Sequence, residues 1–213
     1  MLDKSLDFKD LIMRIEADKL QNMQPPILPE GYSFRLFTTG GEADWARIET
    51  SVDEFESMGS AQAYFEQAYL PHRQEVEKRC LFVLNPEGFP IGTALSWYAD
   101  SALGHQALLN WVAVCPDYQG LGLGRAIVQQ ALINFRTLEP DQPVWLHTQT
   151  WSPPAIKLYH QLGFCLMKTA KLANMNSRSG VPKIYENQYE DGIAILKKVM
   201  DAHTVEQMIA KAI

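Results

Sequence analysis

The chain has 213 residues, a formal net charge of −6 and 46% hydrophobic residues. This length suits one domain with a sizeable core, with or without short terminal extensions. The negative charge and the lack of a basic stripe argue against a nucleic-acid partner. Charged residues near the N-terminus and the lack of a long apolar run lead us to expect no secretory leader and no membrane segment.

The three cysteines, Cys80, Cys115 and Cys165, are widely scattered. They form no Cys-x-x-Cys pair, and no Cys/His spacing suggests zinc. We therefore expect no metal site. Their apolar surroundings favour buried, reduced thiols in a cytoplasmic protein.

Residues 1–23 place apolar side chains at roughly helical spacing among charges, which predicts an N-terminal helix. Prolines at positions 25, 26 and 29 follow it, so residues 1–29 are expected to be a helix and linker ahead of the main domain. That domain is predicted to span residues 30–200. Helical spacing in its last part predicts a C-terminal helix within residues 201–213, which covers the sheet edge or joins a homodimer.

Between these ends the chain alternates between two kinds of apolar pattern, and residues 170–191 show neither. Strand patterns occupy residues 32–37, 80–84, 91–98, 107–114, 144–148, 164–169 and 193–198. Helical patterns occupy residues 42–50, 60–77, 123–135 and 153–162. This order predicts a mixed α/β fold with a partly antiparallel sheet.

The most informative stretch runs from Val112 to Arg125 and contains Gly120, Gly122 and Gly124. A strand pattern ends there, and the glycines lead directly into a helical pattern. Glycine tolerates positive φ and has no Cβ to block a ligand, and the first N–H groups of a helix are unpaired. A pyrophosphate-bearing ligand is therefore the first hypothesis, and a tight turn without a ligand is the alternative.

Two other phosphate-binding motifs fit this stretch poorly. No Gly-Lys-Ser or Gly-Lys-Thr follows the glycines, so the phosphate-loop NTPase interpretation fails. The spacing is not Gly-x-Gly-x-x-Gly, which argues against a dinucleotide-binding unit.

Two motifs together resemble those of the GCN5-related N-acetyltransferase superfamily. The first is Gln/Arg-x-x-Gly-x-Gly/Ala preceded by a valine and a proline, and it is matched by Val114, Pro116, Gln119, Gly122 and Gly124. The second is Ala-x-x-Leu-Tyr-x-x-x-Gly-Phe, matched by Ala155, Leu158, Tyr159, Gly163 and Phe164. The resemblance covers roughly residues 31–200. It implies a mostly antiparallel central sheet of about six to seven strands flanked by helices.

The resemblance also implies acetyl-CoA as co-substrate, without a metal. In the family, backbone amides of the glycine turn bind the pyrophosphate, which here assigns this role to Gln119, Gly120, Leu121, Gly122, Leu123, Gly124 and Arg125. The edge of the preceding strand, with Val112, Ala113 and Val114, would bind the pantetheine arm. Ser152 and Ile156 complete the expected contacts, although Ser152 stands where many relatives have asparagine.

By the same resemblance, Tyr159 is the general acid that protonates the departing thiolate, and a plain core tyrosine is the alternative. No base is identified, because the strand before Val112 carries no carboxylate. Asn110 there can position a water but is no strong base. The remaining candidates for the base are Glu54, Glu56, His105 and His147, or a water relay.

The leading hypothesis is an acetyl-CoA-dependent N-acetyltransferase that moves an acetyl group to a primary amine by direct attack in a ternary complex. A catalytically inactive acyl-CoA-binding regulatory or interaction module is the alternative, as is transfer of a larger acyl group or transfer to a hydroxyl. The acceptor is expected to be a small molecule or peptide, with no nucleic acid and no membrane as partner. Asp53, Glu54 and Glu56 would suit a cationic amine, and a solvated acidic loop is the other interpretation.

Overall fold

The computed structural model describes residues 2–175 and 182–213. The strands are β1 Asp10–Ile15, β2 Ser33–Leu36, β3 Cys80–Leu84, β4 Pro90–Ser101, β5 Gly104–Val114, β6 Val144–Gln149, β7 Cys165–Leu166, β8 Lys171–Met175 and β9 Pro182–Glu186. The helices are α1 Ala17–Gln21, α2 Gly41–Ser51, α3 Met58–Ala68, α4 Arg73–Arg79, α5 Leu123–Leu138, α6 Pro153–Gln161, α7 Tyr189–Val199 and α8 Ala202–Ala210, with 3₁₀ turns η1 Leu70–His72 and η2 Pro116–Tyr118.

Seven strands form one sheet in the order β2-β3-β4-β5-β6-β1-β7, and β8 and β9 form a separate hairpin. Within the large sheet only β5 and β6 run parallel, and the other neighbours are antiparallel. The predicted fold class, a mixed fold with a mostly antiparallel sheet flanked by helices, is confirmed.

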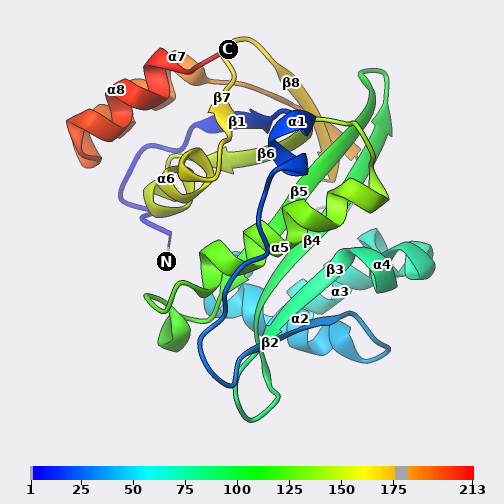
Figure 1. Cartoon of the computed structure of the whole chain (residues 1–213). Coiled ribbons are helices and arrows are strands. Elements are labelled where there is room, and N and C mark those ends of the chain that lie inside the picture. Colours follow the sequence, from blue (N-terminus) through cyan, green and yellow to red (C-terminus); the bar gives the residue numbers. More distant parts are fainter. Residues whose placement is uncertain (1, 176–181) are drawn as a thin grey trace.

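The two faces of the sheet carry different helices (Figure 1). Ser96 Oγ of β4 donates a hydrogen bond of 3.0 Å to the carbonyl oxygen of Ala131 in α5. The next residue, Trp97, points the other way, and its ring lies 4.9 Å from that of Tyr69, just after α3. Since successive residues of a strand face opposite sides, α5 covers one face of β4 and α3 covers the other.

The predicted N-terminal helix over residues 1–23 is wrong. Residues 10–15 form strand β1, which pairs with β6 on one side and β7 on the other. Leu11, Ile12 and Met13 are fully buried. An uninterrupted apolar run is typical of a strand buried on both faces, and this run prevails over the helical spacing of the wider segment. Only the short α1 follows before the prolines.

The helix predicted over residues 60–77 is interrupted. Helix α3 ends at Ala68, η1 follows, and α4 begins at Arg73. Pro71 lies in η1, and proline has no N–H to donate and clashes with the preceding turn of a helix. The proline therefore separates α3 from α4.

The strand predicted over residues 193–198 is also wrong, because these residues belong to α7. Their apolar run is short, and the buried positions Tyr189, Gly192, Ile193 and Leu196 follow a helical period. Helix α7 packs closely on β1. A Cβ on Gly192 would lie 2.6 Å from Leu11 Cδ2.

Part of the unassigned segment 170–191 forms the β8–β9 hairpin, while residues 176–181 lie outside the described residues. The hairpin contacts β5, since the Ala173 N–H donates to Gln106 Oε1 over 3.0 Å.

A helix, α8, occupies the C-terminal segment, and the chain end pairs with the sheet edge. The Ile213 N–H donates to the Leu166 carbonyl of β7, and the Lys168 N–H donates to the Ile213 carbonyl. Of the two predicted roles, covering the edge matches these contacts, and the homodimer stays a prediction. Among the residues that the structure describes, no helix is long and apolar enough to cross a membrane.

Candidate functional site

Strands β5 and β6 pair over a short distance and then separate. Their register contains only Ala107↔Val144 and Leu108↔Trp145. Beyond these pairs β5 continues to Val114 and β6 to Gln149, and Figure 1 shows β6 turning away from β5. The edge of β5 from residue 109 to 114 therefore has no strand partner on this side. We call this opening the β5–β6 split.

A β-bulge on β5 lies beside the split. The register runs from Thr93↔Ala113 to Leu95↔Asn110, so Trp111 and Val112 together oppose one residue of β4. Trp111 has φ 51°, a left-handed conformation that is rare for a bulky residue and costs about 1–3 kcal/mol. Bulges bend a strand and are frequent next to active sites. Nothing in the sequence of β5 signals this one.

The glycine turn lies at the end of β5 and opens outward. Gly120 and Gly122 have φ of 82° and 79°, and a Cβ on either would meet nothing within 4 Å. Gln119 Nε2 donates a 2.9 Å hydrogen bond to the Val114 carbonyl, which ties the turn to the strand.

The backbone N–H groups of residues 120–125 make no hydrogen bond to any part of the chain that the structure describes. They precede or open helix α5, whose N-cap Gly122 provides no side-chain acceptor. Unpaired N–H groups at the positive end of a helix dipole form a binding site for an anion. The predicted pyrophosphate-binding residues are thus brought together in one turn.

Helix α6 packs near this turn. A Cβ on Gly124 would lie 3.8 Å from Leu158 Cδ2, so the first turn of α5 lies close to the second half of α6. Ser152 is the N-cap of α6, but its hydroxyl makes no capping bond. It is half-buried, whereas the Ile156 side chain is fully buried and presents no surface to a ligand.

Tyr159 lies on α6 and is 8% exposed. Its hydroxyl makes no hydrogen bond to the described residues. Burial raises the pKa of Tyr159, and the nearby charges of Glu54 and Glu49 raise it further. The hydroxyl therefore keeps its proton at neutral pH and is available as a donor.

The three acidic residues predicted for the acceptor follow α2. Burial of its carboxyl raises the pKa of Glu54, although the residue as a whole is exposed, and Lys4 and His147 act in the opposite direction. Asp53 has φ 66°, and its carbonyl accepts a 3.0 Å hydrogen bond from Lys4 Nζ. Glu56 is exposed and forms no ion pair within the described ranges.

Glu49 was missed by the sequence analysis. It is 1% exposed on α2, and its Oε1 has no hydrogen-bond partner among the described residues. Burial and then the charge of Glu54 raise the pKa of Glu49. Its position one helical turn after the buried Trp45 is the signal that would have placed it on the inner face.

Four aromatic rings pack together beneath the bulge. The rings of Trp45, Phe55, Tyr64 and Trp111 lie 5.2 to 6.1 Å from one another. At these distances the rings are in contact with one another. The group therefore supports Trp111 and leaves no space between the four rings for a ligand.

The residues considered as base or water ligand fall in different places. His105 lies at the start of β5, bonded to Asp100 and Glu139 over 2.8 and 2.9 Å. At about 3.3 Å per residue it is about 30 Å from the glycine turn, so it is no part of this site. The side-chain amides of Asn110 and Asn174 of β8 form two hydrogen bonds of 3.0 Å with each other.

His147 does lie beside the split. It is in β6, and its Nε2 is 2.6 Å from Asp10 Oδ1 of β1. The Asp10 contribution was not predicted, because the two residues are 137 positions apart.

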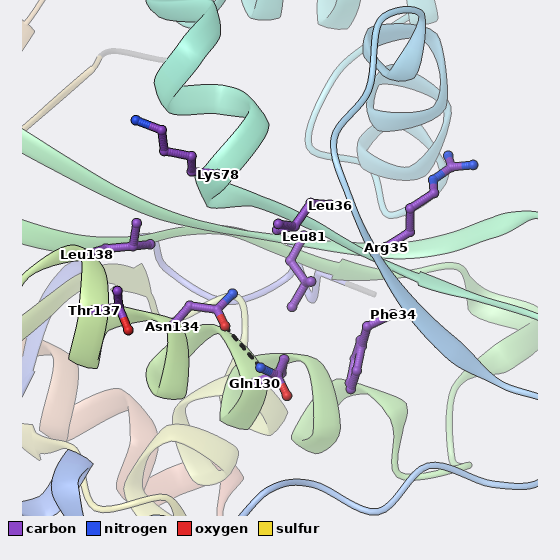
Figure 2. Close-up of a pocket in the computed structure, with 9 residues that line it drawn as sticks. All are labelled: Phe34, Arg35, Leu36, Lys78, Leu81, Gln130, Asn134, Thr137 and Leu138. Atoms are coloured by element: carbon purple, nitrogen blue, oxygen red, sulfur yellow. Dashed lines mark hydrogen bonds between the residues drawn. The ribbon is translucent and has the colours of Figure 1, made fainter.

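The pocket in Figure 2 lies elsewhere, between α5 and the β2–β3 edge. Its volume is about 470 Å³, and Gln130 and Asn134 on its wall bond to each other over 2.9 Å. Its lining residues include no carboxylate, histidine or cysteine. A second pocket of about 340 Å³ is lined by Asp10 and residues 183–188. Within the described ranges no group of three or more His, Cys, Asp or Glu side chains is placed to hold a metal ion.

Comparison with known proteins gives concordant matches. The model of the Acetyltransferase (GNAT) family matches residues 44–164. The mycothiol acetyltransferase of Actinosynnema mirum is 27% identical over 162 residues, which cover 74% of this chain and 52% of that protein. The mycothiol acetyltransferase of Acidothermus cellulolyticus is 25% identical over 169 residues, covering 72% and 51%. The chain thus spans about half the length of these curated relatives.

Solved structures share the fold. The crystal structure of a GCN5-related N-acetyltransferase from Sphaerobacter thermophilus superposes with a TM-score of 0.58 at 23% identity. The match covers 76% of this chain and 49% of that one.

Proposed function

Since the chain belongs to the GNAT acetyltransferase family, we propose that it is an acetyl-CoA-dependent N-acetyltransferase whose acceptor is a primary amine on a small molecule or peptide. One observation carries the proposal: the unpaired N–H groups of residues 120–125 lie next to the unpaired edge of β5. The turn suits a pyrophosphate, and an extended pantetheine arm can add to the strand edge. The open space outside Gly120 and Gly122 leaves room for the phosphates.

The residues around the split suit a direct attack of the amine on the thioester. As the C–N bond forms, negative charge develops on the carbonyl oxygen, and a backbone N–H near Val112 or Ala113 is proposed to stabilise it. When the C–S bond breaks, Tyr159 is proposed to protonate the thiolate sulfur. Its raised pKa keeps the phenol protonated until then. Asn110 and Ser152 are proposed to have supporting roles, as a water ligand and a contact to the pantetheine arm.

A catalytically inactive acyl-CoA-binding module is the second candidate. It is favoured by one observation, the absence of any carboxylate on β5 between Gly104 and Val114. Transfer of a larger acyl group uses the same site and is tested by the same assay with longer acyl-CoA donors.

The assay measures thiol release from acetyl-CoA with a panel of primary amines, in parallel with calorimetric CoA binding. Tyr159→Phe should lower kcat by about 10²-fold or more and leave CoA binding unchanged. Tyr32→Phe, at the β2 edge of the sheet, is the matched control and should leave both unchanged. Binding of CoA without thiol release by any amine would favour the inactive module. Full activity of Tyr159→Phe would refute the acid role.

A further inference from the structure

We propose that His147, oriented by Asp10, is the base that takes the proton from the acceptor amine. This inference rests on the proposed function, because a base is needed at this place only if an amine attacks the thioester. In the step, the ammonium gives one N–H proton to the free imidazole nitrogen, and the neutral amine attacks the carbonyl carbon and forms the C–N bond. As the C–S bond breaks, the thiolate takes the proton of Tyr159, and the second proton lost by the nitrogen replaces it on Tyr159 through solvent. The proton held by His147 passes to water after the product leaves.

The strand register places His147 at the split. Leu108 of β5 pairs with Trp145 of β6, and counting two residues along each strand brings Asn110 opposite His147. The strands no longer pair at this point, so both residues border the split.

The same register places His147 on the face opposite α5. Trp145 shares the face of its partner Leu108, which shares the face of Trp97. Trp97 packs on Tyr69, after α3. The glycine turn leads into α5, so the proposed CoA site and His147 approach the split from different sides. An acceptor bound near His147 would meet the thioester across the opening.

The contacts of His147 leave one ring nitrogen available. Nε2 lies 2.6 Å from Asp10 Oδ1, and the side chains of the two residues are 20% and 22% exposed. Nδ1 has no hydrogen-bond partner among the described residues. It is not fully buried, so a substrate or solvent can contact it. A proton on Nε2 shared with the carboxylate leaves the Nδ1 lone pair free to accept another. This is the arrangement by which a carboxylate orients an imidazole base.

Aromatic and charged groups surround His147, and two of its neighbours line a pocket. The ring of Tyr185 in β9 lies 4.2 Å from the imidazole ring. Tyr185 and Asp10 line the pocket of about 340 Å³. The charged and titratable groups around the imidazole are Asp10 from β1, Tyr185 from β9 and Glu54 from the loop after α2. Two cations lie beyond them: Lys183 Nζ is 4.7 Å from the centroid of the Tyr185 ring, and the charge of Lys4 acts on Glu54. Asp10 and Glu54 favour an incoming ammonium, whereas the two lysines oppose it.

A purely structural role for the pair, as a clamp between β1 and β6, is the competing explanation. Strand β1 is held without it. The Asp10 N–H donates to Gln188 Oε1 over 2.9 Å, the Gln188 N–H donates to the Asp10 carbonyl, and the β1–β6 ladder spans residues 10–15. Substitutions that keep the size of either side chain should therefore leave the protein folded.

The test uses His147→Gln, Asp10→Asn and Glu54→Gln in the full chain, with the primary amine that gives the fastest thiol release. We expect His147→Gln to lower kcat by about 10²-fold, with unchanged CoA binding and an unchanged unfolding midpoint. Asp10→Asn should lower kcat less, because it disturbs only the orientation of the ring. The wild-type rate should level off at high pH, once the base is neutral. The rate of His147→Gln should keep rising with the fraction of free amine. Loss of a structural clamp between β1 and β6 would not change the shape of the pH profile in this way.

Other outcomes separate the two proposals. Full activity of His147→Gln, or a loss of the levelling-off in Glu54→Gln alone, would overturn the role of His147 and leave the acetyltransferase assignment intact. No thiol release by the wild-type protein with any amine would overturn the proposed function and this step with it.

Discussion

The indole N–H of Trp111 donates a 2.7 Å hydrogen bond to the hydroxyl oxygen of Tyr69. Tyr69 is fully buried, and burial raises its pKa well above the ordinary tyrosine value, so it stays neutral. The bond joins the bulge on β5 to the chain between α3 and α4. Since Trp111 is held at positive φ, this anchor helps to maintain the conformation that opens the β5–β6 split.

We therefore predict that Tyr69→Phe destabilises the protein and weakens catalysis together. Loss of the acceptor leaves the Trp111 N–H unpaired inside the aromatic group, which costs about 1–3 kcal/mol of unfolding free energy. Urea unfolding measures this cost, and the thiol-release assay measures the accompanying fall in kcat. Tyr32→Phe, whose hydroxyl has no partner among the described residues, should change neither. Equal unfolding midpoints for the two variants would show that the bond does not hold the bulge.

The docking of α7 on β1 is tested by a pair of glycines. A Cβ on Gly192 would lie 2.6 Å from Leu11 Cδ2, so Gly192→Ala should destabilise the protein by about 1–3 kcal/mol despite the helix propensity of alanine. Gly59 in α3 has only Ser57 Oγ near, at 3.9 Å. Gly59→Ala should stabilise by up to about 1 kcal/mol. Thermal or urea unfolding compares the two variants. An unchanged unfolding free energy of Gly192→Ala would mean that α7 packs on β1 more loosely than in this structure.

His105 predicts a pH dependence of stability. Its hydrogen bond to Asp100, followed by that to Glu139, raises the pKa of His105 while desolvation opposes them. The folded chain thus holds this proton more tightly than the unfolded chain. The contribution to the unfolding free energy is complete below the ordinary histidine value of about 6.5 and is lost as the pH rises through the higher folded-state value.

Urea unfolding at a series of pH values between about 6 and about 9 measures this loss. His105→Gln should flatten the decline. His203→Gln, on the exposed helix α8, should keep the wild-type slope. A wild-type slope in His105→Gln would assign the dependence to other groups.

Local patterns were sufficient for much of the fold. The helical period of α5 and the strand–turn–helix order around the glycines depend on residues close in sequence, so they could be read directly. Strand β1 could not, because its burial comes from β6 and β7, far along the chain. Its apolar residues also fit a helical spacing, and only the partners decide between the two.

The site shows the same division. The glycine turn is one continuous segment, so its residues lie together, and their role in binding a pyrophosphate stays a prediction. The Asp10–His147 contact and the Trp111 bulge arise from pairing between strands, and no spacing in the sequence reports them. Glu49 is buried on α2, which packs on α3, β4 and β5, so its sequence neighbours gave only a helix position.

Calorimetric binding of CoA to Gly122→Ala and Gly88→Ala tests the central claim most directly. Gly122 and Gly88 have φ of 79° and 85°, and a Cβ on either meets nothing within 4 Å, so alanine imposes a similar backbone cost of about 1–2 kcal/mol at both. Only Gly122 belongs to the turn of unpaired N–H groups, and Gly88 lies in the β3–β4 turn. We predict that Gly122→Ala weakens CoA binding by about tenfold or more, while Gly88→Ala binds like the wild type. Wild-type affinity in Gly122→Ala would contradict the assignment of the turn as the pyrophosphate site.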